Sequence, residues 1–265
     1  MEELAGRPEE PPDYFFVGNS GPRLPDGGPI YRESPVDPVT LPPGAIAEPW
    51  NTATALLFVV LALAWLIRLR GHYARHPFTL ACLPILLAGG IGGTLYHMHR
   101  SRYAYFLLDV IPINLLGLAG AIYLAARLAR QSGWLKVGLA AAGAVGAYLL
   151  FNGVLFRGLL GALGGNRHMI VNISYASLAA VLLIPLGAVL LRTRFRHGNL
   201  VLAALASFAI AWFLRLADGL PGSLPMGTHW LWHTFGVLTT LALLEYFQRI
   251  EVETLEPDPT VIRSD

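Results

Sequence analysis

Long hydrophobic runs, separated by short polar stretches, dominate the chain from residue 48 onward. Each of seven such runs is close to the roughly 20 residues that an α-helix needs to cross a bilayer. They lie at about 50–69, 78–98, 104–127, 134–156, 168–191, 199–217 and 228–248. Only a helix satisfies every backbone group within one lipid-exposed segment. The pattern therefore predicts an all-α membrane protein built as a bundle of seven transmembrane helices.

The two ends of the chain differ from this hydrophobic portion. Residues 1–47 contain ten prolines, and proline lacks the backbone donor that helices and central strands need, so we expect an irregular extramembrane arm. Residues 48–250 form the predicted transmembrane domain, and residues 251–265 form an acidic, solvated tail.

Basic residues between the hydrophobic runs predict the orientation in the membrane. The loops after the first, third and fifth runs carry nine of them, at Arg68, Arg70, Arg75, Arg127, Arg130, Lys136, Arg192, Arg194 and Arg196. The alternate loops carry five, at Arg100, Arg102, Arg157, Arg167 and Arg215. Because cytoplasmic loops are enriched in basic residues, we expect the N-terminus outside and the C-terminus in the cytosol. A single lysine among the basic residues favours a bacterial source. The membrane would then be the cytoplasmic membrane, or that of the ER or Golgi in a eukaryote.

Composition narrows the classes of partner and cofactor. The chain is 54% hydrophobic and 14% charged, with a formal net charge of +2 and no basic cluster. We therefore expect the lipid bilayer and a membrane lipid as partners, and no nucleic acid. Cys82 is the single cysteine, which excludes an intramolecular disulfide and a cysteine-based zinc finger.

Ionisable residues of the hydrophobic runs are predicted to share one layer of the bundle. His229 and His233 lie one helical turn apart on one face of the last run. In a seven-helix serpentine, the end of the second run and the starts of the first, third and seventh face the same side of the membrane. This layer, on the outer side by the arginine count, contains Glu48, His97, Asp109, His229 and His233. Ionisable residues inside a membrane are costly and are presumed functional.

Three imidazoles with one open position are typical of a catalytic zinc site, where zinc lowers the pKa of a water to about 7. Asp109 could orient that water or take its proton, with a helix-packing acid as the alternative. Thr94 lies on the helix face of His97 and could donate to the water or to an oxyanion. It could equally bond to its own helix backbone. For the histidine pair, the alternative is two interfacial side chains bonded to neighbouring helices.

Together these residues resemble the alkaline ceramidase family, part of the CREST superfamily of seven-transmembrane metal-dependent hydrolases. The matching motifs are Ala47-Glu48-Pro49-Trp50-Asn51-Thr52, Tyr96-His97-Met98, Asp109-Val110-Ile111-Pro112 and His229-Trp230-Leu231-Trp232-His233. Their order agrees with that family over roughly residues 45–248. Two features depart from it: Gly93 stands where the family has a serine, and the interval from His97 to Asp109 is one residue longer.

The resemblance implies specific roles for these positions. His97, His229 and His233 would be zinc ligands, Asp109 would lie beside the water, and Thr94 would replace the family serine. Glu48 would join a calcium site with the N-terminal arm. Asp37 and Glu33 are its possible further oxygen donors, or they are solvated acids of a Pro-rich arm.

The expected function is that of a zinc-dependent integral membrane hydrolase. It would cleave the amide bond of ceramide, or of a similar N-acyl lipid, to a fatty acid and a sphingoid base; an ester would be open to the same attack. The alternative is a seven-transmembrane receptor or signalling protein, of the adiponectin-receptor or haemolysin-III type, with a structural zinc. Haem held by His97 and one histidine of the pair is a third alternative.

Overall fold

The computed structural model describes residues 24–35, 41–42, 44–130, 133–150, 158, 167–220 and 222–253, with the backbone alone for 167–170. Asp37, one of the predicted calcium ligands, lies outside these residues. Within them the protein is all-helical, with seven α-helices and no strand. The helices are α1 (Pro49–Arg68), α2 (Pro77–His99), α3 (Tyr103–Ala129), α4 (Trp134–Leu149), α6 (Arg167–Arg192), α7 (Gly198–Ala217) and α8 (His229–Glu251), with a short 3₁₀ helix at Tyr73–Arg75.

The helix boundaries follow local sequence signals. Proline occupies the first position of both α1 and α2, where its missing N–H would have no intrahelical partner. Helix α2 ends at Arg100, which adopts a left-handed conformation with φ 47° and donates its N–H to the Tyr96 carbonyl. This sharp turn reverses the chain directly into α3.

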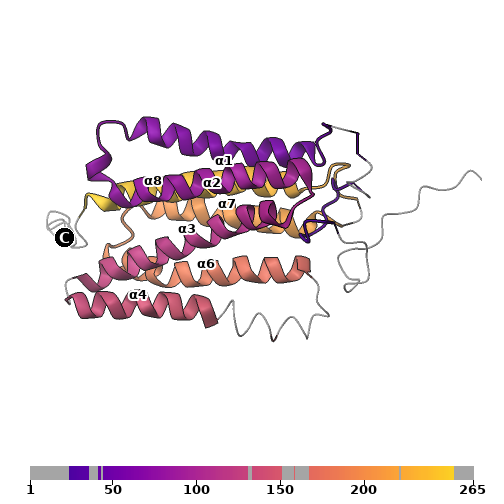
Figure 1. The fold of residues 1–265 in the computed structure, drawn as a ribbon. Coiled ribbons are helices and arrows are strands. Elements are labelled where there is room, and N and C mark those ends of the chain that lie inside the picture. The colour runs from indigo at the N-terminus through magenta and orange to yellow at the C-terminus, as the bar shows by residue number, and fades with distance from the viewer. Residues whose placement is uncertain are drawn as a thin grey trace, which may run out of the picture.

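The helices lie side by side as an elongated bundle (Figure 1). Helix α1 packs on α2 and α8, α3 packs on α2, α4 and α6, and α7 packs closely on α8. Helices α6 and α7 follow one another in the sequence but touch at few positions. The described arm residues 24–35 lie at one end of the bundle, and α8 finishes at the opposite end. Helix ends that are distant in sequence therefore meet beside the arm.

Five of the helices are long and apolar enough to cross a membrane: α1, α2, α3, α6 and α7. Helix α4 is apolar but has only 16 described residues. Helix α8 has 23 residues but is not among the five, and it carries two histidines, Glu245 and Arg249. The all-helical prediction is confirmed for the described residues, and five spans are compatible with an integral membrane protein. Seven spans and the orientation remain predictions.

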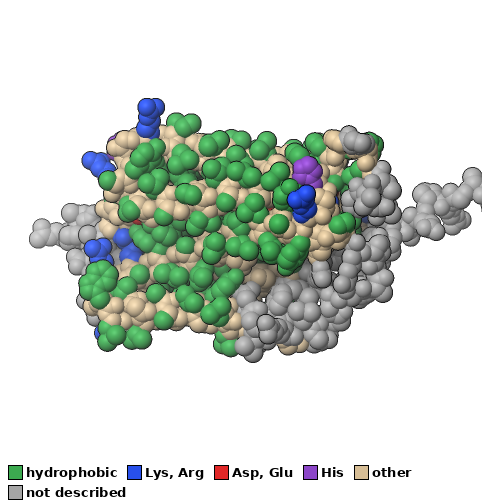
Figure 2. Space-filling view, viewed as in Figure 1, with side chains coloured by type: hydrophobic (Ala, Val, Ile, Leu, Met, Phe, Trp, Pro, Cys, Tyr) green, Lys and Arg blue, Asp and Glu red, His purple; other side chains and the backbone are tan. Residues whose placement is uncertain are grey.

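Large apolar side chains cover the outside of the bundle. Figure 2 shows one face on which hydrophobic side chains spread over the middle, with basic side chains at its ends. Ile67, Ile184 and Leu202 each expose more than 60% of their surface. Exposed apolar surface on this scale is unfavourable in water, but it packs favourably against lipid chains. Inside, apolar clusters around Trp65, and around Leu124 with Tyr246, hold the helices together.

Candidate metal centre

Three buried histidines meet at the arm end of the bundle. His97 comes from the last turn of α2, and His229 and His233 come from the first two turns of α8. Their exposed fractions are 0%, 1% and 5%. Each offers a ring nitrogen, and these nitrogens all lie within 4.8 Å of one another. The cluster could therefore hold a metal ion.

Glu48 fixes the orientation of the first histidine. The Nδ1 of His97 lies 2.5 Å from Oε2 of Glu48, and both side chains are fully buried. An ionised carboxylate only accepts, so Nδ1 carries the proton and the lone pair is on Nε2. That Nε2 is buried, and no described residue forms a hydrogen bond with it. A carboxylate behind a ligating histidine is common at metal sites, and an orphaned imidazole nitrogen fits a metal ligand.

A threonine orients the second histidine in the same way. Thr54 Oγ1 lies 2.8 Å from the Trp50 carbonyl oxygen and 3.0 Å from Nδ1 of His233. The hydroxyl donates its single proton to the carbonyl oxygen, so Oγ1 accepts a hydrogen bond from Nδ1–H of His233. The Nε2 lone pair of His233 is therefore available for a metal.

The third histidine has different neighbours. Arg215 Nη1 lies 3.3 Å from Nδ1 of His229, and the ring of Tyr31 stacks on the imidazole at 3.7 Å between centroids. Asp218 fixes the backbone here, because its Oδ1 accepts the N–H groups of Thr228 and His229 at the start of α8.

The two residues predicted to act on water have different surroundings. Asp109 lines the cavity described below, together with His229 and His233. A Cβ atom added at Gly93 would lie 2.7 Å from Oδ1 of Asp109, so the missing side chain at Gly93 makes space for that carboxylate. Thr94 donates its hydroxyl to the carbonyl oxygen of Gly90 in its own helix at 2.7 Å and is not part of the cavity lining.

Two of the carboxylates predicted to bind calcium, Glu48 and Glu33, are bonded to donors of the protein itself. Glu48 Oε1 pairs with Nη1 of Arg100, whose Nε donates to Asp26 at 2.7 Å. Burial alone would raise the pKa of the Glu48 carboxyl, but Arg100 and His97 lower it to about 2. Glu33 instead caps α1, accepting the N–H groups of Trp50 and Asn51 at 2.6 and 3.0 Å. A buried guanidinium therefore supplies positive charge to Glu48, and the two carboxylates are occupied by the protein's own donors.

The described part of the arm closes the site at the end of the bundle. Besides Asp26, Arg100 binds the carbonyl oxygen of Pro29 and the hydroxyl of Ser34, at 2.7 and 2.8 Å. Tyr31, between these two positions, is 5% exposed and lies over His229. The histidines are thus covered on the arm side.

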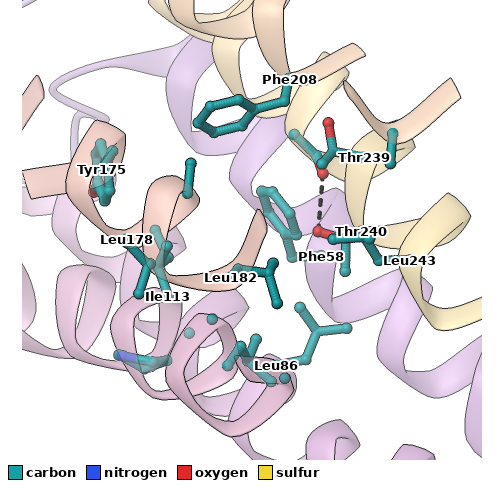
Figure 3. A pocket seen from close by; sticks show the side chains of 18 of the residues that line it. Phe58, Leu86, Ile113, Tyr175, Leu178, Leu182, Phe208, Thr239, Thr240 and Leu243 are labelled. Atoms are coloured by element: carbon teal, nitrogen blue, oxygen red, sulfur yellow. Dashed lines mark hydrogen bonds between the residues drawn. The ribbon is translucent and has the colours of Figure 1, made fainter. Parts of the chain in front are cut away.

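On the other side, His229 and His233 line an apolar cavity of about 310 Å³ (Figure 3). Its lining comes from α1, α2, α3, α6, α7 and α8, with side chains such as Phe58, Leu86, Leu178 and Phe208 pointing into it. The charged residues of the described lining are Asp109 and Arg215. On α2 the lining extends from Gly93 to Phe78, which at 1.5 Å per residue is about 22 Å along the bundle.

Four residues that shape the site were missed as members of it: Tyr31, Arg100, Arg215 and Asp218. The two arginines were counted as loop charges, yet they are 0% and 2% exposed. A signal existed for Arg215, because it lies inside the predicted run 199–217, and a charge within a span is presumed functional. The pairing of Arg100 with arm carboxylates has no local sequence signal.

No model of a protein family matches the chain, and neither a curated protein nor a solved structure does. The resemblance to the alkaline ceramidases therefore rests on the motifs alone.

Proposed function

We propose that the protein is a zinc-dependent membrane hydrolase that cleaves the amide bond of an N-acyl lipid such as ceramide. The observation that carries the proposal is a cluster of three buried histidines, two of which line an apolar cavity together with Asp109. A metal site beside an apolar cavity that admits one hydrocarbon chain is what such a reaction needs.

The donor set fits zinc in an open, catalytic coordination. Zinc favours imidazole nitrogens, and three protein ligands leave a fourth position for water or substrate. Among the described residues, no carboxylate or cysteine joins the three histidines as a fourth ligand. A zinc ion bound here would supply a Lewis acid that polarises a carbonyl and lowers the pKa of water to about 7. Glu48 and Thr54 hold the imidazoles of His97 and His233 in the required tautomer.

Asp109 is the group best placed to move a proton. No described residue donates a hydrogen bond to its carboxylate, which faces the cavity beside the histidines. An unoccupied carboxylate can take a proton from water and pass it to the nitrogen of the leaving amine. Thr94 is not part of the proposed site, because its hydroxyl is bonded to its own helix backbone and it does not line the cavity.

The cavity and the arm divide the tasks of binding lipid and excluding water. The apolar lining suits one hydrocarbon chain lying along the bundle, with its carbonyl at the histidine end. The sparse contact between α6 and α7 offers the substrate a lateral path from the bilayer. At the other side, Tyr31 and Arg100 close the site against bulk water.

The test combines metal analysis with detection of lipid products. We expect the purified full chain to contain about one zinc per molecule and to release fatty acid and sphingoid base from ceramide, detected by mass spectrometry. His97→Ala should lose both. His99→Ala should keep both, because His99 is exposed two residues further along the same helix. The proposal is refuted if the His97 variant hydrolyses ceramide as fast as the His99 variant.

The same preparation tests the alternatives. Zinc at full occupancy with no turnover on N-acyl or ester lipids would favour a structural metal in a signalling protein. Release of fatty acid from an ester but not from ceramide would assign the protein as an esterase. A Soret band in the visible spectrum would indicate haem.

A further inference from the structure

Two buried arginines lie near the histidines, and their charges are balanced differently. Arg100 is 0% exposed and pairs with the carboxylates of Asp26 and Glu48. Arg215 is 2% exposed, yet within the described part of the chain no Asp or Glu forms an ion pair with it. A buried charge without an ion-pair partner is unfavourable. Asp109 lines the same cavity and interacts with Arg215 electrostatically, but it forms no ion pair with the guanidinium. The guanidinium is therefore open to an anion from outside the described chain.

The contacts of Arg215 hold it in place without neutralising it. Its Nε donates to Oδ1 of Asn172 at 2.7 Å, and its guanidinium lies 5.3–5.7 Å from the ring centroids of Tyr31, Tyr175 and Trp232. The side chain of Arg215 also forms a hydrogen bond with that of Tyr31, and its contact with Nδ1 of His229 is long at 3.3 Å. Neutral amides and aromatic faces position a guanidinium, but its full positive charge remains.

Asp218 is not the missing counter-ion, although it follows Arg215 by one helical turn. Its Oδ1 accepts the N–H groups of Thr228 and His229, and its Oδ2 accepts the N–H of Arg32 at 2.9 Å. This carboxylate is committed to the start of α8 and to the arm.

The charged group of Arg215 faces the apolar cavity. Arg215 is part of the cavity lining together with Asp109, and the rest of that lining is almost entirely apolar. A ligand with one negative charge at the end of a long hydrocarbon chain matches both features. Arg215 is the single Arg or Lys of the described lining, which matches the one charge of a carboxylate.

We propose that Arg215 binds the carboxylate of a long-chain fatty acid whose hydrocarbon chain fills the cavity. A bidentate, charge-assisted pair with the carboxylate replaces the long contact to His229. The proposed function accounts only for the source of the fatty acid, as the product of amide cleavage; the binding itself does not depend on turnover.

Equilibrium binding of two probes to the full chain in nanodiscs tests this assignment. Palmitate and hexadecanol have similar hydrocarbon chains, but only palmitate is an anion. Arg215→Gln should weaken palmitate binding about tenfold or more, because hydrogen bonds to charged groups contribute at least that factor. Hexadecanol binding should be unchanged. Arg215→Lys should lie between the two, and Arg102→Gln, at an exposed arginine near the same end, should match the unaltered protein.

A second variant keeps the guanidinium of Arg215 and gives it a carboxylate partner within the protein. Asn172→Asp places a carboxylate at the Nε of Arg215, 2.7 Å away in the unaltered protein. Palmitate affinity should fall in this variant as well, and it decides the question if Arg215→Gln does not fold. The assignment is overturned if both variants bind palmitate like the unaltered protein. It is equally overturned if hexadecanol binding falls in parallel, since a collapsed cavity would then explain the loss.

Turnover is measured separately on the same samples. Palmitate binding that depends on Arg215 in a protein without hydrolase activity would leave this assignment standing and remove the proposed function. Hydrolysis of ceramide, with palmitate binding that does not change in the Arg215 variants, would support the proposed function and overturn this assignment.

Discussion

Replacing Glu48 by glutamine tests the link between the arm and the metal centre. The substitution keeps the shape of the side chain but removes its charge and turns one acceptor into a donor. That donor then faces either Arg100 or Nδ1–H of His97. Breaking a buried ion pair from one side costs about 3–5 kcal/mol. We expect the lower end of that range, because Arg100 keeps its pair with Asp26.

The same substitution should weaken metal binding. Glu48 is the partner that fixes the tautomer of His97, and removing such a partner lowers metal affinity by about 10–100-fold. Unfolding in mixed micelles measures the stability loss, and competition with a chelating dye measures the metal affinity.

Glu33→Gln is the matched control, because Glu33 also lies at the N-terminal end of α1. Its carboxylate accepts two backbone N–H groups and no histidine. Loss of this cap should cost about 1 kcal/mol and leave the metal affinity unchanged. Equal metal affinities in Glu48→Gln and Glu33→Gln would refute the role assigned to Glu48.

Three further perturbations follow from the site. Gly93→Ala should push the Asp109 carboxylate aside, since the new methyl group would lie 2.7 Å from Oδ1; hydrolysis should fall while bound metal, measured by elemental analysis, stays constant. Calcium chelation by EGTA should leave the melting temperature unchanged, because Arg100 already pairs with Asp26 and Glu48; a lower melting temperature would support the predicted calcium site. Asp218→Ala should cost about 1–2 kcal/mol as a lost helix cap and also reduce metal occupancy, because His229 begins that helix; full occupancy would contradict the second expectation.

The long hydrophobic runs were sufficient to locate the helices. The predicted run 78–98 became Pro77–His99, and 199–217 became Gly198–Ala217. The spacing of His229 and His233, and the end at which His97 lies, were also sufficient to bring three imidazoles together. These features depend on helix geometry and on the order of the spans, which the sequence contains.

Contacts between distant polar groups could not be predicted in this way. Whether Glu48 meets a cation or a guanidinium depends on how the arm folds back, and no spacing rule covers that. Arg100 and Arg215 were read as loop charges, but burial removes them from the surface. Without them the alternate loops carry three basic residues in place of five. The predicted orientation therefore rests on a larger asymmetry than the sequence count suggested.

Because the arm covers the metal centre, the rate at which the arm opens should determine how long a metal ion stays bound. Any ion held by the three histidines lies beneath Tyr31 and the segment fastened by Arg100. A charged chelator reaches it only when that segment detaches, because the opposite route passes through hydrocarbon. Metal loss should then follow the opening rate of residues 24–35 and reach a limit that more chelator does not raise. By the same geometry, an ion would enter before the arm closes or during such an opening.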